Sequence, residues 1–376
     1  MLRVVDGIAR AIHESPRWKF LTVLLAIAIL KSGVWFVPNI ALSASIAEDP
    51  FTSHPESVYL MENWLAGFLA WLLGMHGTLP YLLMHALFAV AFVAVVLVLL
   101  FRRLPEASAR NAAIVFAALP ASMTAFYWIG LDGLTLLLLA LALLASRRWW
   151  LVAPIGVLLG LHHFEQGVFA SGALLLAAGL GALLRTGPWR AALFPAALLA
   201  GDLVGFGVRS WIFAANGIVV DYDRVEYLVT NLRPLVRGFV ENPAIMVFSM
   251  LALGWIVVIR YAAASGRRAL PLLVALACLV LLMPFYEDRT RVAAITSFLL
   301  VTATVLLDER FMAGIGRRES AVFAALWFIV PWLWVWGDVT YTSVTVYDLE
   351  VVLNRLTGHP GDVPHGAPEL GVWAFR

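Results

Sequence analysis

Charged side chains, lysine and cysteine are all scarce in this chain of 376 residues. Charged residues make up 13% of the sequence, lysine occurs only at Lys19 and Lys31, and Cys278 is the single cysteine. One cysteine excludes both an intramolecular disulfide and a cysteine-based zinc site. Soluble domains carry about 25% charged residues, so the low charge also argues against a water-soluble protein.

Nucleotide-binding and hydrolase motifs are absent as well. The sequence contains no phosphate-binding P-loop, no glycine fingerprint for a dinucleotide, no HExxH and no G-x-S-x-G. Nothing in it indicates a nucleic-acid partner. We therefore expect any activated substrate to arrive already attached to a lipid.

Long apolar runs dominate what is present. Hydrophobic residues make up 62% of the sequence, and they come in blocks long enough to cross a membrane. This predicts an all-α polytopic membrane protein in which residues 1–376 form a single transmembrane domain, with an interfacial helix before the first span. About eleven transmembrane helices are expected, near 18–37, 79–101, 111–129, 131–146, 149–163, 164–184, 191–213, 244–259, 269–285, 293–307 and 320–337.

The positions of the arginines predict the orientation of these spans. Basic residues collect on the cytoplasmic side of membrane proteins. Here they gather at the N-terminus and in alternate connections, at Arg102, Arg103, Arg110, Arg147, Arg148, Arg185, Arg190, Arg260, Arg267, Arg268, Arg310, Arg317 and Arg318. The N-terminus is therefore expected in the cytoplasm and the C-terminus outside, in a bacterial inner (plasma) membrane. Most acidic residues lie on the outer face, which becomes the better candidate for chemistry.

Three regions are expected outside the membrane: a first outer loop at 38–78, a second at 214–243 and the tail at 338–376. The first contains AEDPFTSHPE, in which Pro50 and Pro55 prevent one regular helix. Apolar residues then return at helical spacing over 57–73, which predicts helices in the outer interface. A short re-entrant or simply buried helix is the alternative.

Two carboxylate positions are candidates for catalysis. Glu48 and Asp49 stand side by side on the proline-stiffened loop, where such a pair can act as a base or bind a cation. Asp132 occupies a very short turn between two expected spans. It could cap the helix that begins at Gly133, act in chemistry, or do both.

The segment GLHHFEQGVFA places His162, His163, Glu165 and Gln166 between two apolar runs. Ionisable groups at membrane depth usually line a polar cavity or pair with each other. Their spacing does not put all of them on one helical face, so this segment alone does not predict a metal site. Contact with a substrate or phosphate, led by His163 with support from Glu165, is favoured over packing alone.

Arginines also occur where the outer face is expected. Arg289 and Arg291 follow Glu287 and Asp288 in a short loop, and the guanidinium group suits phosphate or carboxylate. A local salt bridge among these four residues is the alternative. Arg209 lies two helical turns from Asp202. It is expected near the outer end of its span, within reach of a lipid headgroup.

This arrangement resembles the GT-C superfamily of integral membrane glycosyltransferases. The resemblance rests on the cytoplasmic N-terminus, the acidic pair Glu48 and Asp49 in the first outer loop, the interfacial helices at 57–73 and Asp132 at a later outer turn. It covers residues 1–146, and the chain lacks the large soluble C-terminal domain of many members. The resemblance implies a polyprenyl-phosphate-linked sugar as donor and a lipid, glycan or protein as acceptor.

The resemblance also implies roles for individual residues. The first-loop acid of the family is the catalytic base or a metal-associated carboxylate, a role that falls here to Asp49 with Glu48 as its rival. Basic residues of the family hold the lipid phosphate, which points to Arg289, Arg291 and Arg209. A divalent cation, Mg²⁺ or Mn²⁺, would bind at Glu48 and Asp49, and the sugar would be transferred with inversion.

Two other classes of function stay open. The protein could be another outer-face enzyme on lipid-linked glycans, a polymerase, ligase or acyl transferase, with His163 as the base. It could also be a transporter or lipid flippase, with a path past Asp202, Arg209 and the HHFEQ segment. The short cytoplasmic connections and the lack of a two-fold repeat count against transport.

Overall fold

Helices account for nearly all of the regular structure. The computed structural model describes residues 2–34, 40–54, 58–220, 224–331, 333–336 and 339–342, and it is 82% helical, so the all-α prediction is confirmed apart from one small hairpin. In the first third of the chain the helices are α1 Leu2–Glu14, α2 Arg17–Ser32, α3 Ile40–Ser45, α4 Val58–Met61, α5 Trp64–Leu72, α6 Thr78–Arg103, α7 Glu106–Ala118 and α8 Pro120–Tyr127.

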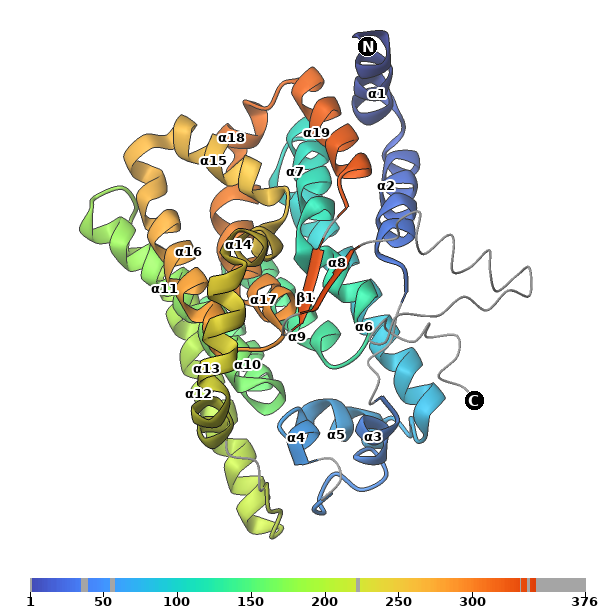
Figure 1. Ribbon diagram of the computed structural model, residues 1–376, viewed down its shortest axis with the longest axis vertical. Helices are drawn as coiled ribbons and strands as arrows, with labels where there is room; N and C mark the ends of the chain where they lie inside the picture. Colours follow the sequence, from blue (N-terminus) through green and yellow to red (C-terminus); the bar gives the residue numbers. More distant parts are fainter. Residues whose placement is uncertain are drawn as a thin grey trace.

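The remaining elements continue the helical layer and end in a hairpin (Figure 1). They are α9 Asp132–Ala145, α10 Trp149–His162, α11 Phe164–Leu183, η2 Trp189–Ala192, α12 Leu193–Ala215, α13 Arg224–Glu241, α14 Pro243–Leu251, α15 Gly254–Ser265, η3 Gly266–Ala269, α16 Leu270–Leu282, η4 Met283–Phe285, α17 Arg289–Val301, the π-helical η5 Thr302–Leu306, α18 Glu309–Ala313, α19 Arg317–Ile329, β1 Leu333–Trp336 and β2 Val339–Thr342. The two strands pair antiparallel, with Leu333 opposite Thr342.

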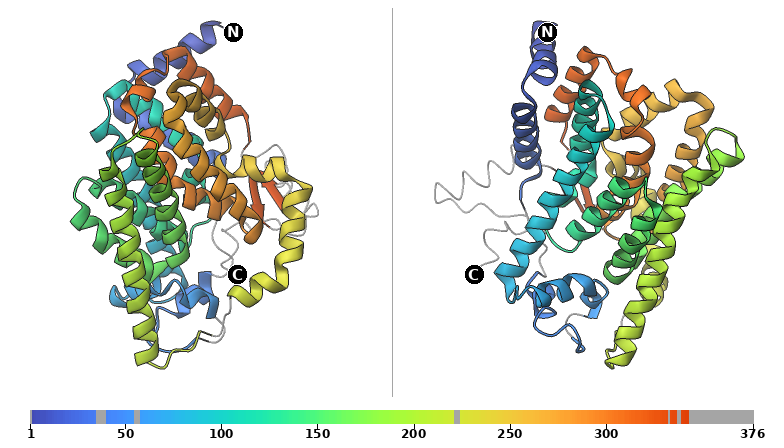
Figure 2. Two further views of the ribbon diagram at one scale, coloured as in Figure 1. Left: turned by 90° about the vertical axis from the view of Figure 1, so that its left-hand side faces the viewer. Right: turned by 180° about the vertical axis from the view of Figure 1, so that it is seen from behind.

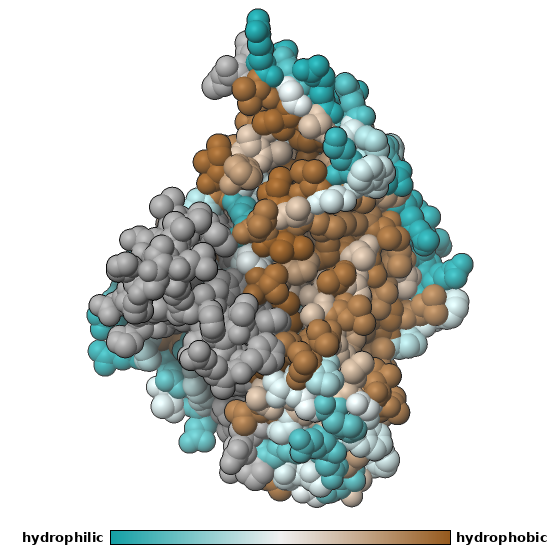
Figure 3. Space-filling model, turned by 90° about the vertical axis from the view of Figure 1, so that its right-hand side faces the viewer, coloured by the Kyte–Doolittle hydropathy of each residue, from teal (hydrophilic) through white to brown (hydrophobic). Residues whose placement is uncertain are grey.

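Five helical segments of the described chain are long and apolar enough to cross a membrane. They are Thr78–Arg103, Phe164–Leu183, Trp189–Ala215, Gly254–Phe285 and Arg289–Leu306, while α9 and α10 are shorter apolar helices. Hydrophobic residues form a broad band across the middle of the molecule, between hydrophilic surfaces above and below it (Figure 3). Both observations are compatible with a multi-pass membrane protein.

Several expected spans differ from the helices that form. Residues 111–129 divide into α7 and α8, because Pro120 has no N–H to donate and holds Leu119 at an extended ψ of 143°. Residues 244–259 are interrupted at Ala252, whose φ is +48°. In 320–337, α19 ends at Ile329 and the aromatic and β-branched residues after Pro331 form β1.

The first outer loop folds into α3, α4 and α5, which lie together at the end of the molecule away from the N-terminus (Figure 1). The helical spacing over 57–73 becomes two helices, with a break at Glu62 and Asn63. The second outer loop contains α13. Of the tail expected at 338–376, only 339–342 lies within the described residues, where it forms β2.

The arginine-bearing connections meet at the end of the molecule where α1 lies, which we call the arginine-rich end. Arg260 donates to Glu319 Oε2 at 2.7 Å, and Arg317 donates to Glu14 at 2.9 Å, so α15, α19 and α1 converge there. Arg103 reaches Ser146 at 3.3 Å and joins the ends of α6 and α9. The turns after α8, α10 and η4 lie at the opposite end, together with α3–α5.

Small residues allow α10 and α12 to run side by side in the same direction, beside α11 (Figure 2, right). Gly156 and Gly160 of α10 face Gly201 and Gly205 of α12. A Cβ added at Gly160 would lie well inside contact distance of the Asp202 carbonyl oxygen, and one added at Gly205 would meet the Val157 carbonyl. This is the small-xxx-small pattern of membrane helix pairs, and the packing fixes where Asp202 and Arg209 lie.

Candidate functional site

Asp132 lies at the centre of a polar cluster at the opposite end from α1. It is the first residue of α9 and is 2% exposed. Its Oδ1 accepts a hydrogen bond from Gln166 Nε2 at 3.1 Å, and its Oδ2 accepts one from Arg291 Nη1 at 3.1 Å. The N-cap position of α9 is held by Leu131, and the Asp132 carboxylate hydrogen-bonds to other helices. Asp132 therefore connects α9 to α11 and α17 instead of capping its own helix.

Arg291 lies between two carboxylates. Besides Asp132, its Nε forms an ion pair with Asp288 Oδ2 at 2.8 Å. Asp288 is the N-cap of α17 and accepts from the Arg291 backbone N–H at 3.4 Å. The local salt bridge considered from the sequence does form, but it is one half of a longer link. The Arg291 side chain as a whole is 18% exposed, although its Nε atom is buried against Asp288.

Burial also affects the protonation of Asp288. The side chain lies between the spans that end at Phe285 and begin at Arg289. Its removal from water raises the pKa of Asp288 to about 6, although Arg291 favours the ionised form and lowers the pKa. Asp132 adds a second negative charge nearby and raises it further. The charge on this cluster therefore changes in the mildly acidic range.

The junction of α10 and α11 brings four polar residues to the same end. His163 takes φ −147° and ψ 79°, which ends α10 and reverses the chain into α11. His162 is fully buried, and its Nε2 lies 2.8 Å from the Leu131 carbonyl oxygen in the turn before Asp132. His163 Nδ1 lies 3.5 Å from Glu165 Oε2. The segment thus contacts the Asp132 cluster through His162 and Gln166.

Glu165 connects the junction to α12. Glu165 interacts electrostatically with both Arg209 and Asp202. Arg209 is 5% exposed, donates to the Glu62 carbonyl between α4 and α5, and lies over the Phe206 ring at 5.3 Å. Arg209 therefore fastens the first-loop helices to α12.

Asp202 is the most enclosed carboxylate in this part of the protein. It is 1% exposed, and within the described residues neither of its oxygens has a hydrogen-bond partner. Its carboxylate packs against the Cα of Gly167, where an added Cβ would lie 2.8 Å from Oδ1. Its position combines tight helix packing with an ionisable group, which is unusual for a purely structural residue.

The helices α3, α4 and α5, with the acidic turn between α3 and α4, form what we call the first-loop cap. Glu48 and Asp49 lie on its surface, and both are exposed. Asp49 organises its own turn, since its Oδ1 accepts from the Phe51 N–H at 3.0 Å and its carbonyl oxygen lies 2.8 Å from His54 Nε2. In the part of the chain that the structure describes, no hydrogen bond or ion pair joins either carboxylate to the Asp132 cluster. The two groups of acids are therefore separate in this conformation.

The first-loop cap nevertheless covers the cluster. Trp64 donates from Nε1 to the Pro50 carbonyl at 2.8 Å, which holds the acidic turn against α5. Ile46 and Trp64 belong to an apolar cluster that packs against Leu131 and Leu161. These two leucines immediately precede Asp132 and His162, so the cap rests on the turns that carry the buried polar residues.

Arg289 is placed differently from Arg291. It is fully buried, and its Nη2 donates to the Leu235 carbonyl of α13 at 2.7 Å. Its Nη1 lies 3.3 Å from Met246 Sδ in α14. These contacts favour a structural role for Arg289, in which it attaches the second outer loop to the start of α17.

Gln166 and Asp288 belong to the cluster, although neither was predicted as a catalytic or substrate-binding residue. Both lie within segments that the sequence singled out, but their partners are distant in the chain. The helix pair α10–α12 was also missed, and the repeated G-x-x-x-G at Gly156 and Gly201 is the signal that predicts it.

Metal binding requires several ligand side chains close together. Among the described residues, no group of three or more His, Cys, Asp or Glu side chains is placed to hold a metal ion. A cation at Glu48 and Asp49 stays a prediction.

No protein-family model matches the chain, and no curated protein or solved structure shows significant similarity to it.

Proposed function

We propose that this protein is a membrane glycosyltransferase that moves a sugar from a polyprenyl-phosphate donor to a lipid, glycan or protein acceptor. The observation that carries the proposal is Arg291, whose side chain is partly exposed and whose guanidinium group is held between the carboxylates of Asp132 and Asp288. Such a group is fixed in orientation and can exchange a carboxylate contact for a lipid phosphate.

We also propose an orientation of the chain in the membrane. The arginine-rich end lies in the cytoplasm under the positive-inside rule, in the inner membrane of a bacterium, and the Asp132 cluster lies at the outer face. The five long helices and the two shorter apolar helices would supply seven crossings; the proposal of about eleven crossings with an outer C-terminus assigns the others to the remaining helices. The exposed Trp71 and Leu72 of α5 then sit in the outer interface, since they are 39% and 61% exposed.

In the proposed reaction, a hydroxyl oxygen of the acceptor attacks the anomeric carbon of the donor sugar. The bond between that carbon and the phosphate oxygen breaks, and its electron pair stays on the lipid phosphate. Asp49 takes the hydroxyl proton, with Glu48 as its rival, and one displacement at carbon inverts its configuration. Arg291 and Arg209 stabilise the charge that grows on the departing phosphate.

The other residues of the cluster would orient these groups. Asp132 holds the Arg291 side chain, Gln166 donates to the other oxygen of Asp132, and His162 ties the α10–α11 junction to the turn before Asp132. His163 and Glu165 would contact the substrate beside Arg209. A divalent cation at Glu48 and Asp49 belongs to the proposal and is tested by adding a chelator to the transfer assay.

The experiment is a transfer assay with the full-length protein in lipid nanodiscs, using a panel of polyprenyl-phosphate sugars as donors. Asp49→Asn should lower transfer at least about a hundredfold, since a general base contributes this much. Glu48→Gln is the matched neighbour and should have a much smaller effect. Equal transfer by wild type and Asp49→Asn would remove the base assignment, and no transfer from any donor would end the proposal.

One observation favours a second candidate, a transporter or lipid flippase. Asp202 is buried within a span without a hydrogen-bond partner among the described residues, and such carboxylates often relay protons or bind cargo. In that case liposomes containing the protein should move a labelled polyprenyl phosphate across the bilayer. Asp202→Asn would stop this movement, whereas a transferase would lose little activity.

A further inference from the structure

A cavity of about 240 Å³ lies near the arginine-rich end, far from the Asp132 cluster. It is enclosed by the second half of α11, by η2 and the start of α12, by η3 and α16, and by η5. Most of its wall is apolar and includes Leu174, Phe194 and Leu272. The cavity is therefore suited to hydrocarbon and not to a sugar.

One side of the cavity is formed by an unusual backbone. Residues Thr302–Leu306 are π-helical, and Leu307 donates from its N–H to the Thr302 carbonyl at 3.1 Å. Two residues of this turn, Ala303 and Thr304, line the cavity. The turn ends α17 before the chain enters α18, and such i→i+5 turns occur at the C-termini of helices. It therefore shapes one wall of the cavity and brings Thr304 to its lining.

Arg268 brings a positive charge to the same cavity. It is exposed and lines the space opposite α11. Among the described residues Arg268 has no ion-pair partner, whereas Arg260 on the same hairpin is paired with Glu319. Arg185, Arg190 and Arg267 belong to the turns that flank the cavity, and Asp308 lies beside it too, since it interacts with the lining residue Tyr261. The charge and the apolar wall together indicate a ligand that is anionic at one end and hydrocarbon at the other.

We propose that this cavity binds an anionic phospholipid of the leaflet at the arginine-rich end. Its headgroup phosphate would pair with Arg268, and an acyl chain would lie against Leu174, Phe194 and Leu272. Basic pockets between transmembrane helices recognise such headgroups. The site depends on the protein lying in a membrane, but it does not depend on sugar transfer at the other end.

The test is native mass spectrometry of the delipidated full-length protein with added phosphatidylglycerol or phosphatidylcholine of identical acyl chains. Phosphatidylglycerol should bind about fivefold more tightly, because one arginine near an anionic headgroup contributes about this factor. Arg268→Gln should remove the preference, while Arg267→Gln, which does not line the cavity, should keep most of it. Equal binding of both lipids by wild type, or equal behaviour of the two variants, would overturn the proposal.

A second pair of variants tests the cavity itself. Ala178→Phe should fill it and abolish binding of phosphatidylglycerol, whereas Ala264→Phe adds the same ring on an exposed face outside the cavity. If Ala178→Phe does not fold, Ala303→Leu fills the same space from the π-helical turn. Unchanged binding in a folded cavity variant contradicts the proposal. Inorganic phosphate binding that equals phosphatidylglycerol binding in affinity would show that the acyl chain contributes nothing, and it would also reject the proposal.

Discussion

Arg291 and Asp132 are separated by 159 residues in the chain, yet Arg291 Nη1 donates to Asp132 Oδ2 at 3.1 Å. This bond joins the first residue of α9 to the first turn of α17. Gln166 adds α11 to the same carboxylate at 3.1 Å. Three helices therefore share one buried anion at the end of the molecule where we place the chemistry, and the first three predictions concern this link.

Asp132→Asn should destabilise the protein by about 3 kcal/mol. The substitution removes the charge that faces Arg291 while leaving the guanidinium partly buried, and breaking such a pair costs about 3–5 kcal/mol. The lower figure applies because Asp288 still faces Arg291. Thermal or denaturant unfolding in detergent, followed by tryptophan fluorescence, measures the change. Asp49→Asn is the matched control, since Asp49 is exposed, and should shift stability by less than about 0.5 kcal/mol.

Asp132→Asn and Arg291→Gln should be non-additive when combined. Contacting partners show interaction energies of about 0.5–3 kcal/mol in double-mutant cycles. The cycle uses the same unfolding measurement on wild type, both single variants and the double variant. Strict additivity would mean that the two side chains do not interact in solution, and it would weaken the assignment of Arg291 as a fixed phosphate-binding group.

Asp288 should make stability fall as pH rises through the mildly acidic range. Burial raises the pKa of Asp288 from 3.8 to about 6, so the folded protein holds this proton more tightly than the unfolded chain does. The stabilising contribution is complete below pH 3.8 and is lost as pH rises through about 6. The slope is at most about 1.4 kcal/mol per pH unit for one proton.

Asp288→Asn should remove this slope while keeping a good N-cap residue. Unfolding of wild type and variant is compared at several pH values, and the difference between them isolates the group. The variant should gain stability relative to wild type between pH 4 and pH 6 and show a constant difference above that range. A difference that stays constant across the whole range would show that Asp288 has an ordinary pKa in the fold.

Local sequence patterns predict the helices of this protein better than they predict its polar contacts. The apolar runs that form α6, α11 and α12 need only composition and length for their recognition. The breaks at Leu119 and Ala252 depend on particular backbone conformations, of which only the one before Pro120 has a clear sequence signal. The strand β1 also continues an apolar run, so hydropathy alone does not separate it from a span.

The sequence predicts several residues of the candidate site, but it does not predict which of them contact each other. Asp132, His162 and Arg291 each stand at a short turn between apolar segments, where polar residues are conspicuous. Their partners come from other helices, and the sequence contains no information on which turn faces which. Asp49 is the opposite case: its sequence position predicts a catalytic role, but its contacts with Phe51 and His54 stay within its own loop.

Gly160→Ala should disrupt the packing of α10 on α12. The added Cβ would meet backbone atoms of Asp202 and Phe206, which cannot move without separating the helices. Overpacking of this kind costs about 1–3 kcal/mol. Gly179→Ala is the matched control, because nothing lies within 4 Å of its Cβ position in α11, and it should be neutral or slightly stabilising. The yield of monodisperse protein and its unfolding temperature provide the comparison, and similar values for both variants would contradict the close approach.

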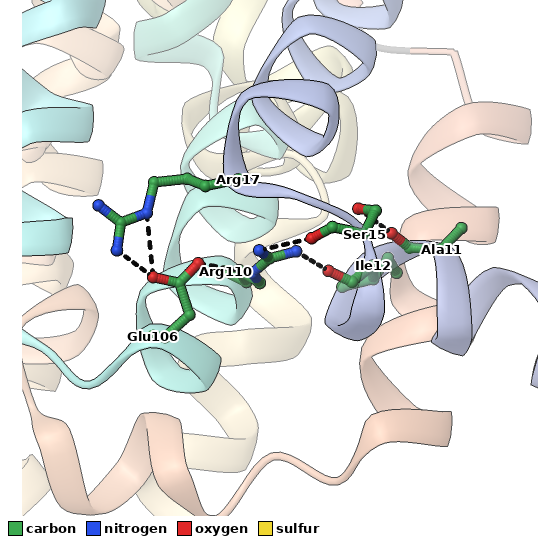
Figure 4. Close-up of polar contacts among 6 residues, drawn as sticks. All are labelled: Ala11, Ile12, Ser15, Arg17, Glu106 and Arg110. Carbon is green, nitrogen blue, oxygen red and sulfur yellow. Dashed lines mark hydrogen bonds and ion pairs between the residues drawn. The ribbon is translucent and has the colours of Figure 1, made fainter.

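Arg110→Ala should loosen the attachment of α1 to α7, leaving the ion pairs of α1 with α19 in place. Arg110 is 4% exposed, and it donates to the carbonyl oxygens of Ile12 and Ser15 and to Glu106 Oε1 (Figure 4). Arg17 reaches the other oxygen of Glu106 from the start of α2, and this hydrogen bond is the largest cause that lowers the pKa of Glu106. Removing the buried guanidinium leaves two backbone carbonyls without their donor and should cost about 2–4 kcal/mol.

The effect of Arg110→Ala should be confined to the first two helices. Hydrogen exchange should rise sharply over residues 2–16, and trypsin should cut at Arg10, while α6 to α12 keep their protection. Arg10→Ala is the control for loss of an arginine from the same end, because Arg10 is exposed.

Acid should weaken the same attachment of α1 in the wild-type protein. The lowered pKa of Glu106 means that its contribution is present above its usual value of 4.5 and is lost as pH falls through the folded-state pKa. Protection of residues 2–16 that survives Arg110→Ala would show that the apolar contacts of Ala9 and Ile12 and the ion pairs with α19 hold α1 in place without the guanidinium.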